Sequence, residues 1–162
     1  MTRADKTPAR ARFVVCEDGH EYTQRFTRLL GQGCEFVRAS HLAEARRAVI
    51  DGQTAGLLLD LDFRRTPASA LIDEAGSAAP ARPGSESQRL ATVQGILILR
   101  ALRADGVALP ALLFADLDDP AQATFLESSL APLQIVPSSA ALPDIARALA
   151  SMAARARRDD GP

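Results

Sequence analysis

The stretch GLLLDLD, residues 56–62, decides the fold of this chain. Its uncharged first half has the composition of a β-strand that is covered on both faces, as strands of parallel sheets are. Two aspartates, Asp60 and Asp62, complete the stretch. Because ligands of parallel sheets bind at the carboxyl ends of the strands, this stretch predicts a central strand with an acidic site at its end.

Similar apolar runs, each followed by an amphipathic segment, lie on both sides of this stretch. The other predicted strands are FVVC at 13–16, CEFV at 34–37, LPALLF at 109–114 and LQIV at 133–136. Apolar residues at helical spacing predict helices at 20–30, 40–50, 87–104, 120–130 and from 143 onward. This alternation predicts right-handed crossovers and a single α/β domain with a doubly wound, five-stranded parallel sheet.

The pattern is interrupted between residues 66 and 89, where 15 of 24 residues are Ala, Ser, Pro or Gly. So little apolar surface does not offset the conformational entropy lost on ordering. The segment is therefore predicted to be a long, mobile loop inserted after the third strand. The two ends, 1–11 and 154–162, are predicted to be flexible tails, which leaves residues 12–153 as the folded domain.

Composition excludes several classes of function. The net charge of -1 at pH 7 provides no general attraction to nucleic acid or anionic lipid. No apolar run is long enough to span a membrane, and the charged N-terminus does not resemble a signal peptide. Cys16 and Cys34 lack the spacing of a zinc site and are predicted to be reduced thiols. We therefore expect a cytoplasmic protein that binds neither nucleic acid nor membrane.

Acidic residues gather at the predicted carboxyl ends of the strands. Glu17 and Asp18 follow the first strand, and Asp60 follows the third. Three carboxylates at one edge do not ionise together easily unless a cation lies between them, and Mg²⁺ suits such oxygen ligands. An aspartate held there can accept a phosphoryl group. Glu17, Asp18 and Asp60 are therefore the candidate metal ligands, and the pattern indicates phosphoryl chemistry.

A second acidic group follows the fourth strand and consists of Asp116, Asp118 and Asp119. Pro120, the next residue, is typical of the first turn of a helix. For this group we favour helix capping over metal binding.

The order of these motifs resembles the CheY-like receiver domains of bacterial response regulators, over nearly the whole chain. The matches are FVVCED at 13–18, LLLD at 57–60, GILILR at 95–100, LPALLF at 109–114 and the pair Val136-Pro137. The resemblance implies a flavodoxin-like, three-layer α/β/α fold in which Asp60 is the phosphoacceptor. It also implies that helix 120–130, the last helix and the fifth strand form the surface for protein partners.

The departures from the receiver pattern concern the phosphorylation switch. The fourth strand is followed by Ala115 where the family has Ser or Thr, and Val136 replaces the family's lysine. The only lysine of the chain is Lys6, so no core lysine can substitute. Arg64 or Arg65 can supply positive charge, but a planar guanidinium does not replace an ammonium one for one. The site is predicted to keep its acids and to have lost its switch positions.

Three hypotheses for function remain. The favoured one is a pseudo-receiver, a protein–protein interaction module without enzymatic activity, because Ala115 and Val136 replace the switch residues. The alternative is a functional, atypical receiver that a histidine kinase phosphorylates on Asp60. The third is a haloacid-dehalogenase-type phosphatase, suggested by LDLD at 59–62, although that family also needs a lysine. We expect weak Mg²⁺ binding as the only cofactor interaction, and a monomer or weak homodimer.

Overall fold

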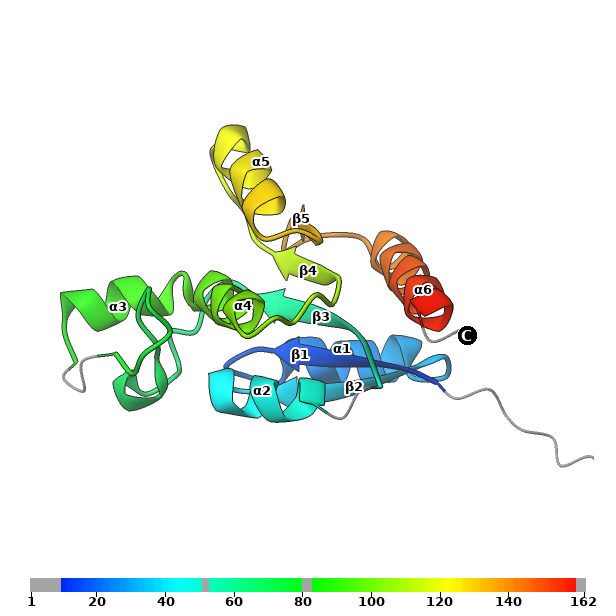
Figure 1. Ribbon diagram of the computed structural model, residues 1–162, viewed down its shortest axis with the longest axis horizontal. Helices are drawn as coiled ribbons and strands as arrows, with labels where there is room; N and C mark the ends of the chain where they lie inside the picture. The colour runs from blue at the N-terminus through cyan, green and yellow to red at the C-terminus, as the bar shows by residue number, and fades with distance from the viewer. Residues whose placement is uncertain (1–9, 51–52, 80–82, 160–162) are drawn as a thin grey trace, which may run out of the picture.

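The computed structural model describes residues 10–50, 53–79 and 83–159 and contains a parallel sheet of five strands (Figure 1). The strands are β1 (Ala11–Cys16), β2 (Cys34–Ala39), β3 (Thr54–Asp60), β4 (Ala111–Phe114) and β5 (Leu133–Val136). Their order in the sheet is β2-β1-β3-β4-β5. The doubly wound α/β fold predicted from the alternating pattern is confirmed.

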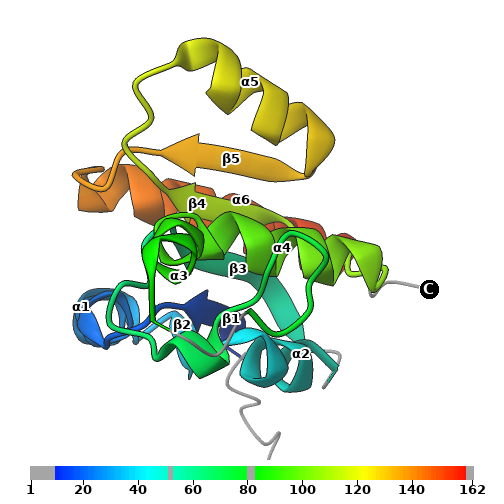
Figure 2. The ribbon, with the colours of Figure 1, turned by 90° about the vertical axis from the view of Figure 1, so that its left-hand side faces the viewer.

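Helices cover both faces of the sheet and make three layers (Figure 2). On one face, α1 (Glu21–Leu30) and α6 (Leu142–Asp159) contribute Phe26, Ile145 and Leu149 to one core cluster. On the other face lie α2 (Leu42–Ile50), α4 (Gln94–Ala104) and α5 (Pro120–Ser129), whose apolar residues belong to the second cluster. The two clusters explain why strand β3 needs apolar residues on both sides.

Strand β3 lies at the centre of the sheet and sets the position of the acidic edge. Leu57 and Leu59 belong to one core cluster, Leu58 belongs to the other, and all three are fully buried. Cys16 is in register with Leu59, and Asp60 with Phe114. The residues that follow β1, β3 and β4 therefore leave the sheet at one edge, as the sequence predicted.

The helix expected at 87–104 is two helices, α3 (Ser85–Ala91) and α4, and the prediction of one continuous helix was wrong. At the break, the loop after β3 bonds to both helices. Phe63 donates its N–H to the carbonyl of Ala91 at 2.8 Å, and Gly95 donates its N–H to the carbonyl of Leu61 at 3.2 Å. These bonds satisfy backbone groups that a continuous helix would have paired internally.

The inserted segment 66–89 packs against the core in its described part. It contains a short 3-10 helix, η1 (Ala68–Ala70), and its side chains Leu71, Ile72 and Ala79 are buried. The buried amide of Gln94 accepts a hydrogen bond from the N–H of Ile72 at 2.8 Å and donates one to its carbonyl at 3.1 Å. Mobility of the segment stays a prediction, and residues 80–82 lie outside the described residues.

The last helix is longer than expected. Helix α6 continues to Asp159, through most of the predicted tail 154–162, because Met152, Ala153 and Ala156 extend its apolar face along the core. The predicted tail at 1–11 lies almost wholly outside the described residues, and β1 begins at Ala11. No helix in the described ranges has the length and apolarity needed to cross a membrane.

Gly95 permits the close approach of α4 to the end of β3. A Cβ atom at this position would overlap the carbonyl group of Asp60 and lie 3.2 Å from the Cα of Leu61. These are backbone atoms, which cannot move aside as the end of a side chain can. We expect Gly95→Ala to lower the free energy of unfolding by about 2 kcal/mol, measured by urea denaturation.

Gly33→Ala is the matched control for this prediction, because a Cβ there meets no atom within 4 Å. Equal stability of the two variants would show that the contact between α4 and β3 does not restrict residue 95.

Candidate functional site

Glu17 caps the first helix. Its side chain is buried, with 1% of the residue exposed, and lies directly after β1. One carboxylate oxygen accepts the N–H of Tyr22 at 2.9 Å, and the other accepts the N–H of Thr23 at 2.8 Å. A carboxylate at a helix N-terminus satisfies unpaired N–H groups and interacts favourably with the helix dipole. Glu17 is therefore at the predicted edge, but both of its oxygens bind the backbone of α1.

Asp18 is paired with Arg65, which comes from the loop after β3. The Asp18 side chain is 4% exposed. Its Oδ1 accepts a hydrogen bond from Nη2 of Arg65, and its Oδ2 accepts the backbone N–H of Arg65, both at 2.8 Å. The guanidinium also contacts Glu21, with Nη1 2.5 Å from Oε1. These hydrogen bonds from Arg65 lower the pKa of Glu21 to about 2.

A second arginine holds the same loop from the side of β2. Arg38 donates from Nη2 to the carbonyl oxygen of Asp18 at 2.9 Å and from Nε to the carbonyl oxygen of Gly19. Arg38 thus holds the loop between β1 and α1 through its backbone carbonyls, and Arg65 holds it through the carboxylate of Asp18. Sequence reasoning named Arg65 as a source of charge but had no signal for Arg38.

Asp60 lies half-buried at the end of β3. Burial raises its pKa to about 6, and the charge of Asp18 adds to this effect, while hydrogen bonds from the backbone of Asp62 and Leu61 oppose it. Asp62 itself is bound by Arg64, with 2.6 Å between Oδ2 and Nε. Of the two arginines in this loop, one therefore pairs with Asp62 and the other with Asp18.

Tyr22, in the first turn of α1, adds a group that the sequence analysis did not single out. Its ring stacks on Phe114 at the end of β4, with 4.7 Å between the centroids. Burial raises the pKa of the Tyr22 phenol to about 12, and the negative charge of Asp60 contributes, although a hydrogen bond with Ser138 opposes the rise. A neutral tyrosine hydroxyl is thus part of the surroundings of Asp60.

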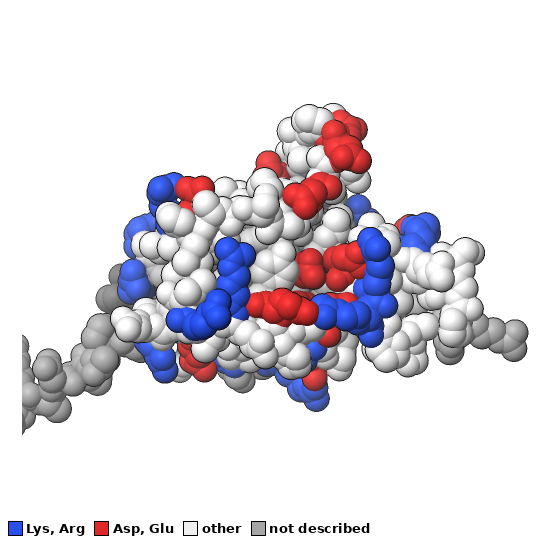
Figure 3. All heavy atoms as spheres, turned by 180° about the vertical axis from the view of Figure 1, so that it is seen from behind, with Lys and Arg blue, Asp and Glu red and all other residues white. Residues whose placement is uncertain are grey.

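The acids after β4 have structural contacts. Asp119 accepts the N–H of Ala121 at 2.9 Å and caps α5, as predicted. Asp116 accepts the N–H of Ser138 at 3.1 Å, which ties the loop after β4 to the loop after β5. Asp118 is exposed. Figure 3 shows acidic side chains across the middle of one face, with basic side chains on either side of them.

The two switch positions carry no polar side chain. Ala115 is 5% exposed, and its N–H donates to the carbonyl of Val136 at 2.9 Å. Val136 packs against the core cluster that contains α6. Around Asp60, therefore, position 115 offers no hydroxyl and position 136 offers no ammonium group.

The predicted ligand set does not fit a magnesium ion in this arrangement. Both carboxylate oxygens of Glu17 accept helix N–H groups, and Asp18 is paired with Arg65. Of the three predicted ligands, only Asp60 takes part in neither of these contacts. Within the described ranges, no group of three or more His, Cys, Asp or Glu side chains is arranged to hold a metal ion.

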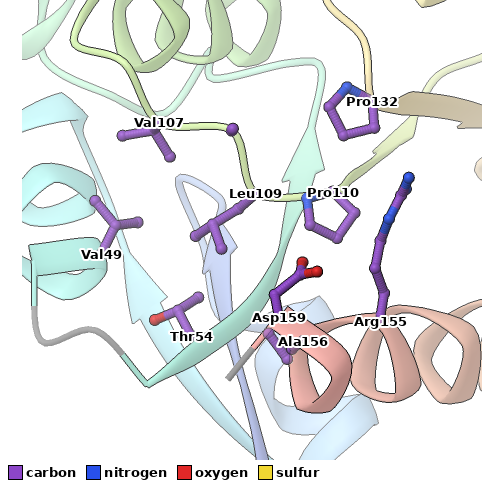
Figure 4. Close-up of a pocket in the computed structure, with 11 residues that line it drawn as sticks. Val49, Thr54, Val107, Leu109, Pro110, Pro132, Arg155, Ala156 and Asp159 are labelled. Carbon is purple, nitrogen blue, oxygen red and sulfur yellow. The ribbon is translucent and has the colours of Figure 1, made fainter. Parts of the chain in front are cut away.

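A cavity of about 540 Å³ lies away from this acidic edge. It is lined by Thr54 and Ala55 at the start of β3, by the loop before β4 and by the end of α6 (Figure 4). Figure 4 shows Arg155 and Asp159 of α6 on one side of the cavity and Val49 and Val107 on the other. Because it is at the opposite end of β3 from Asp60, the cavity is not part of the candidate site.

No family model and no curated protein matches the chain. Solved structures that resemble it include the signal receiver domain of a putative Luxo repressor protein from Vibrio parahaemolyticus, with a TM-score of 0.65, 12% identity and coverage of 94% of this chain and 96% of that one.

The receiver domain of the Francisella response regulator 1452 is similar, with a TM-score of 0.63, 13% identity and coverage of 90% of this chain and 98% of that one. For the beryllofluoride-activated N-terminal receiver domain of Klebsiella pneumoniae RstA, the TM-score is 0.58, the identity 16% and the coverage 88% and 97%. With its strand order and its acidic edge, the chain has the fold of CheY-like receiver domains.

Proposed function

We propose that the chain is a receiver-like signalling module that acts by binding a protein partner and does not depend on phosphorylation of Asp60. The observation that carries the proposal is the pair Ala115 and Val136 next to the acidic edge. A phosphoryl group stabilises a second conformation only if it interacts differently with the two conformations. Apolar side chains at these positions provide no such difference.

The contact between β4 and β5 supports the same proposal. The N–H of Ala115 bonds to the carbonyl of Val136, so the backbone groups that join the two strands at this edge satisfy each other. No polar side chain at either position connects this edge to α5. The module is therefore proposed to present its partner surface in one conformation.

A functional receiver is the second candidate, and one observation favours it. Asp60 is only half-buried at the carboxyl end of β3, where a phosphodonor can approach. In that case a histidine kinase would phosphorylate Asp60. This candidate requires a charge-neutralising partner for the phosphoryl group, and the two arginines of the loop after β3 already bind Asp62 and Asp18.

We place the partner surface on α5, β5 and α6. Phe125 of α5 is 64% exposed, and Leu126 is the buried residue of this helix. Residues 104–146 contain six acids and no lysine or arginine, and Figure 3 shows acidic side chains on the protruding lobe that carries α5. An exposed aromatic ring surrounded by carboxylates suits a partner that has an apolar pocket with basic groups around the pocket.

The edge of the sheet is closed to strand addition in part of its length. Glu127 of α5 accepts the backbone N–H of Ile135 in β5 at 2.8 Å. This bond occupies an edge donor that an added strand would need. The helices are therefore the proposed route of recognition, and β5 supports them.

The phosphorylation state of Asp60 tests the proposal directly. With Mg²⁺ and a small phosphodonor or beryllofluoride, we expect no stoichiometric aspartyl-phosphate by intact mass. Amide NMR shifts are expected to stay local to residue 60. Ala115→Ser combined with Val136→Lys restores a hydroxyl and an ammonium group and is expected to increase the phosphorylated fraction. A stoichiometric adduct in the unmodified protein, with shifts that reach α5 and α6, would overturn the proposal.

The pH dependence of stability tests the environment of Asp60. Its pKa rises from 3.8 to about 6 on folding. As the pH rises, the unfolded state therefore loses the Asp60 proton at a lower pH than the folded state does. Stability contributed by this proton is lost as the pH rises from about 4 to about 6. We expect Asp60→Asn to flatten this loss and to be about 1 kcal/mol more stable at pH 7.5, after allowance for solvent screening.

Asp118→Asn, which removes an exposed carboxylate, is the control and is expected to keep the loss of stability between pH 4 and pH 6. The prediction fails if Asp60→Asn and the unmodified protein lose the same stability between pH 4 and pH 6.

Phe125→Asp tests the partner surface. We expect this change to remove the proteins that co-purify specifically with the tagged chain, measured by quantitative mass spectrometry, and to leave the unfolding midpoint unchanged. Ile50→Asp is the matched control, because Ile50 is a 78% exposed apolar residue on α2, away from the proposed surface. Retention of the same proteins by Phe125→Asp would place the surface elsewhere.

A further inference from the structure

The ion pair between Asp18 and Arg65 joins a buried group to an exposed one. The side chain of Asp18 is 4% exposed, whereas that of Arg65 is 59% exposed. A carboxylate so far from solvent is strongly destabilising unless a positive charge and hydrogen bonds compensate it. Arg65 supplies both, through its guanidinium and through its own backbone N–H.

The geometry uses the planar fork of arginine. Nη2 is 2.8 Å from Oδ1 of Asp18 and 3.0 Å from Oε2 of Glu21, and Nη1 bonds to the second oxygen of Glu21. One guanidinium thus connects the loop after β3 to two acids of the β1–α1 region. A lysine ammonium cannot match this arrangement, because it is a single point of charge.

Gly19 makes room for the ion pair and is an independent observation. A Cβ atom at position 19 would overlap the carboxylate of Glu21 and the guanidinium of Arg65. The backbone next to Asp18 therefore lacks a side chain at the point where these two groups meet. The neighbouring arginines do not take this place, because Arg64 binds Asp62 and Arg38 binds backbone carbonyls.

We infer that Arg65 is the resident cation of the acidic edge. It neutralises Asp18, where the three carboxylates predicted at this edge led us to expect a divalent ion, and it keeps Mg²⁺ out. The folded chain then needs no metal to hold its acids together. This inference concerns the stability and cation binding of the edge and does not depend on the proposed partner surface.

The test compares thermal unfolding of the purified chain in EDTA and in millimolar Mg²⁺. The unmodified protein is expected to have the same midpoint in both solutions. Arg65→Ala is expected to unfold at a lower temperature in EDTA and to recover part of the loss in Mg²⁺, because the ion then reaches Asp18 and Asp60. Arg64→Ala, which removes an exposed partner of Asp62, is the matched control and is expected to respond to neither change.

A second pair of variants keeps the test informative if Arg65→Ala does not fold. Asp18→Asn is expected to lose little stability, because Arg65 is exposed and keeps its ion pair with Glu21. The double variant Asp18→Asn, Arg65→Ala is expected to fold and to be insensitive to Mg²⁺. A rise of the unmodified protein's midpoint in Mg²⁺, or an equal loss from Asp18→Asn and Arg65→Ala, would overturn the inference.

Discussion

A buried carboxylate must be paired, and at position 18 this requirement organises the whole acidic edge. Asp18 is held there by the register of β1 beside β3, and the partner that reaches it is Arg65, from a loop 47 residues further along the chain. The ion pair fixes the path of the loop after β3, because the backbone N–H of Arg65 also bonds to Asp18. The contact between Asp18 and Arg65 therefore both compensates the buried charge and fixes the conformation of the loop.

The path of that loop in turn determines how the helices after it pack. Phe63, which is fully buried, bonds to Ala91 at the end of α3, and Leu61 bonds to Gly95 at the start of α4. The inserted segment then lies against α4. There the side-chain amide of Gln94 forms two hydrogen bonds with the backbone of Ile72, as the backbone of a neighbouring strand would. A segment with little apolar surface is held by a few buried side chains and two specific hydrogen bonds.

Local pattern was sufficient to predict the strands, because each contains a short, mainly apolar run. In the central strand β3 composition also predicted burial, as in Leu57, Leu58 and Leu59. The capping role of Asp119 was also readable from its place before Pro120. The break before Gln94 was not readable, because the groups that satisfy it belong to residues 61 and 63. The partner of Asp18 was equally hidden, since Arg64 and Arg65 are adjacent and only the structure separates their roles.

The acidic edge and the proposed partner surface are joined chiefly through backbone. Coupling between two sites requires an element with two arrangements that both sites can bias. At the junction of β4 and β5, Ala115 and Val136 provide a ladder hydrogen bond and apolar side chains, and neither side chain can pair with a charged group. The Ile135 N–H, which donates to the Glu127 carboxylate, likewise holds α5 on β5. Under the proposed function, a surface built on such contacts binds its partner in a single state, and regulation comes from the partner.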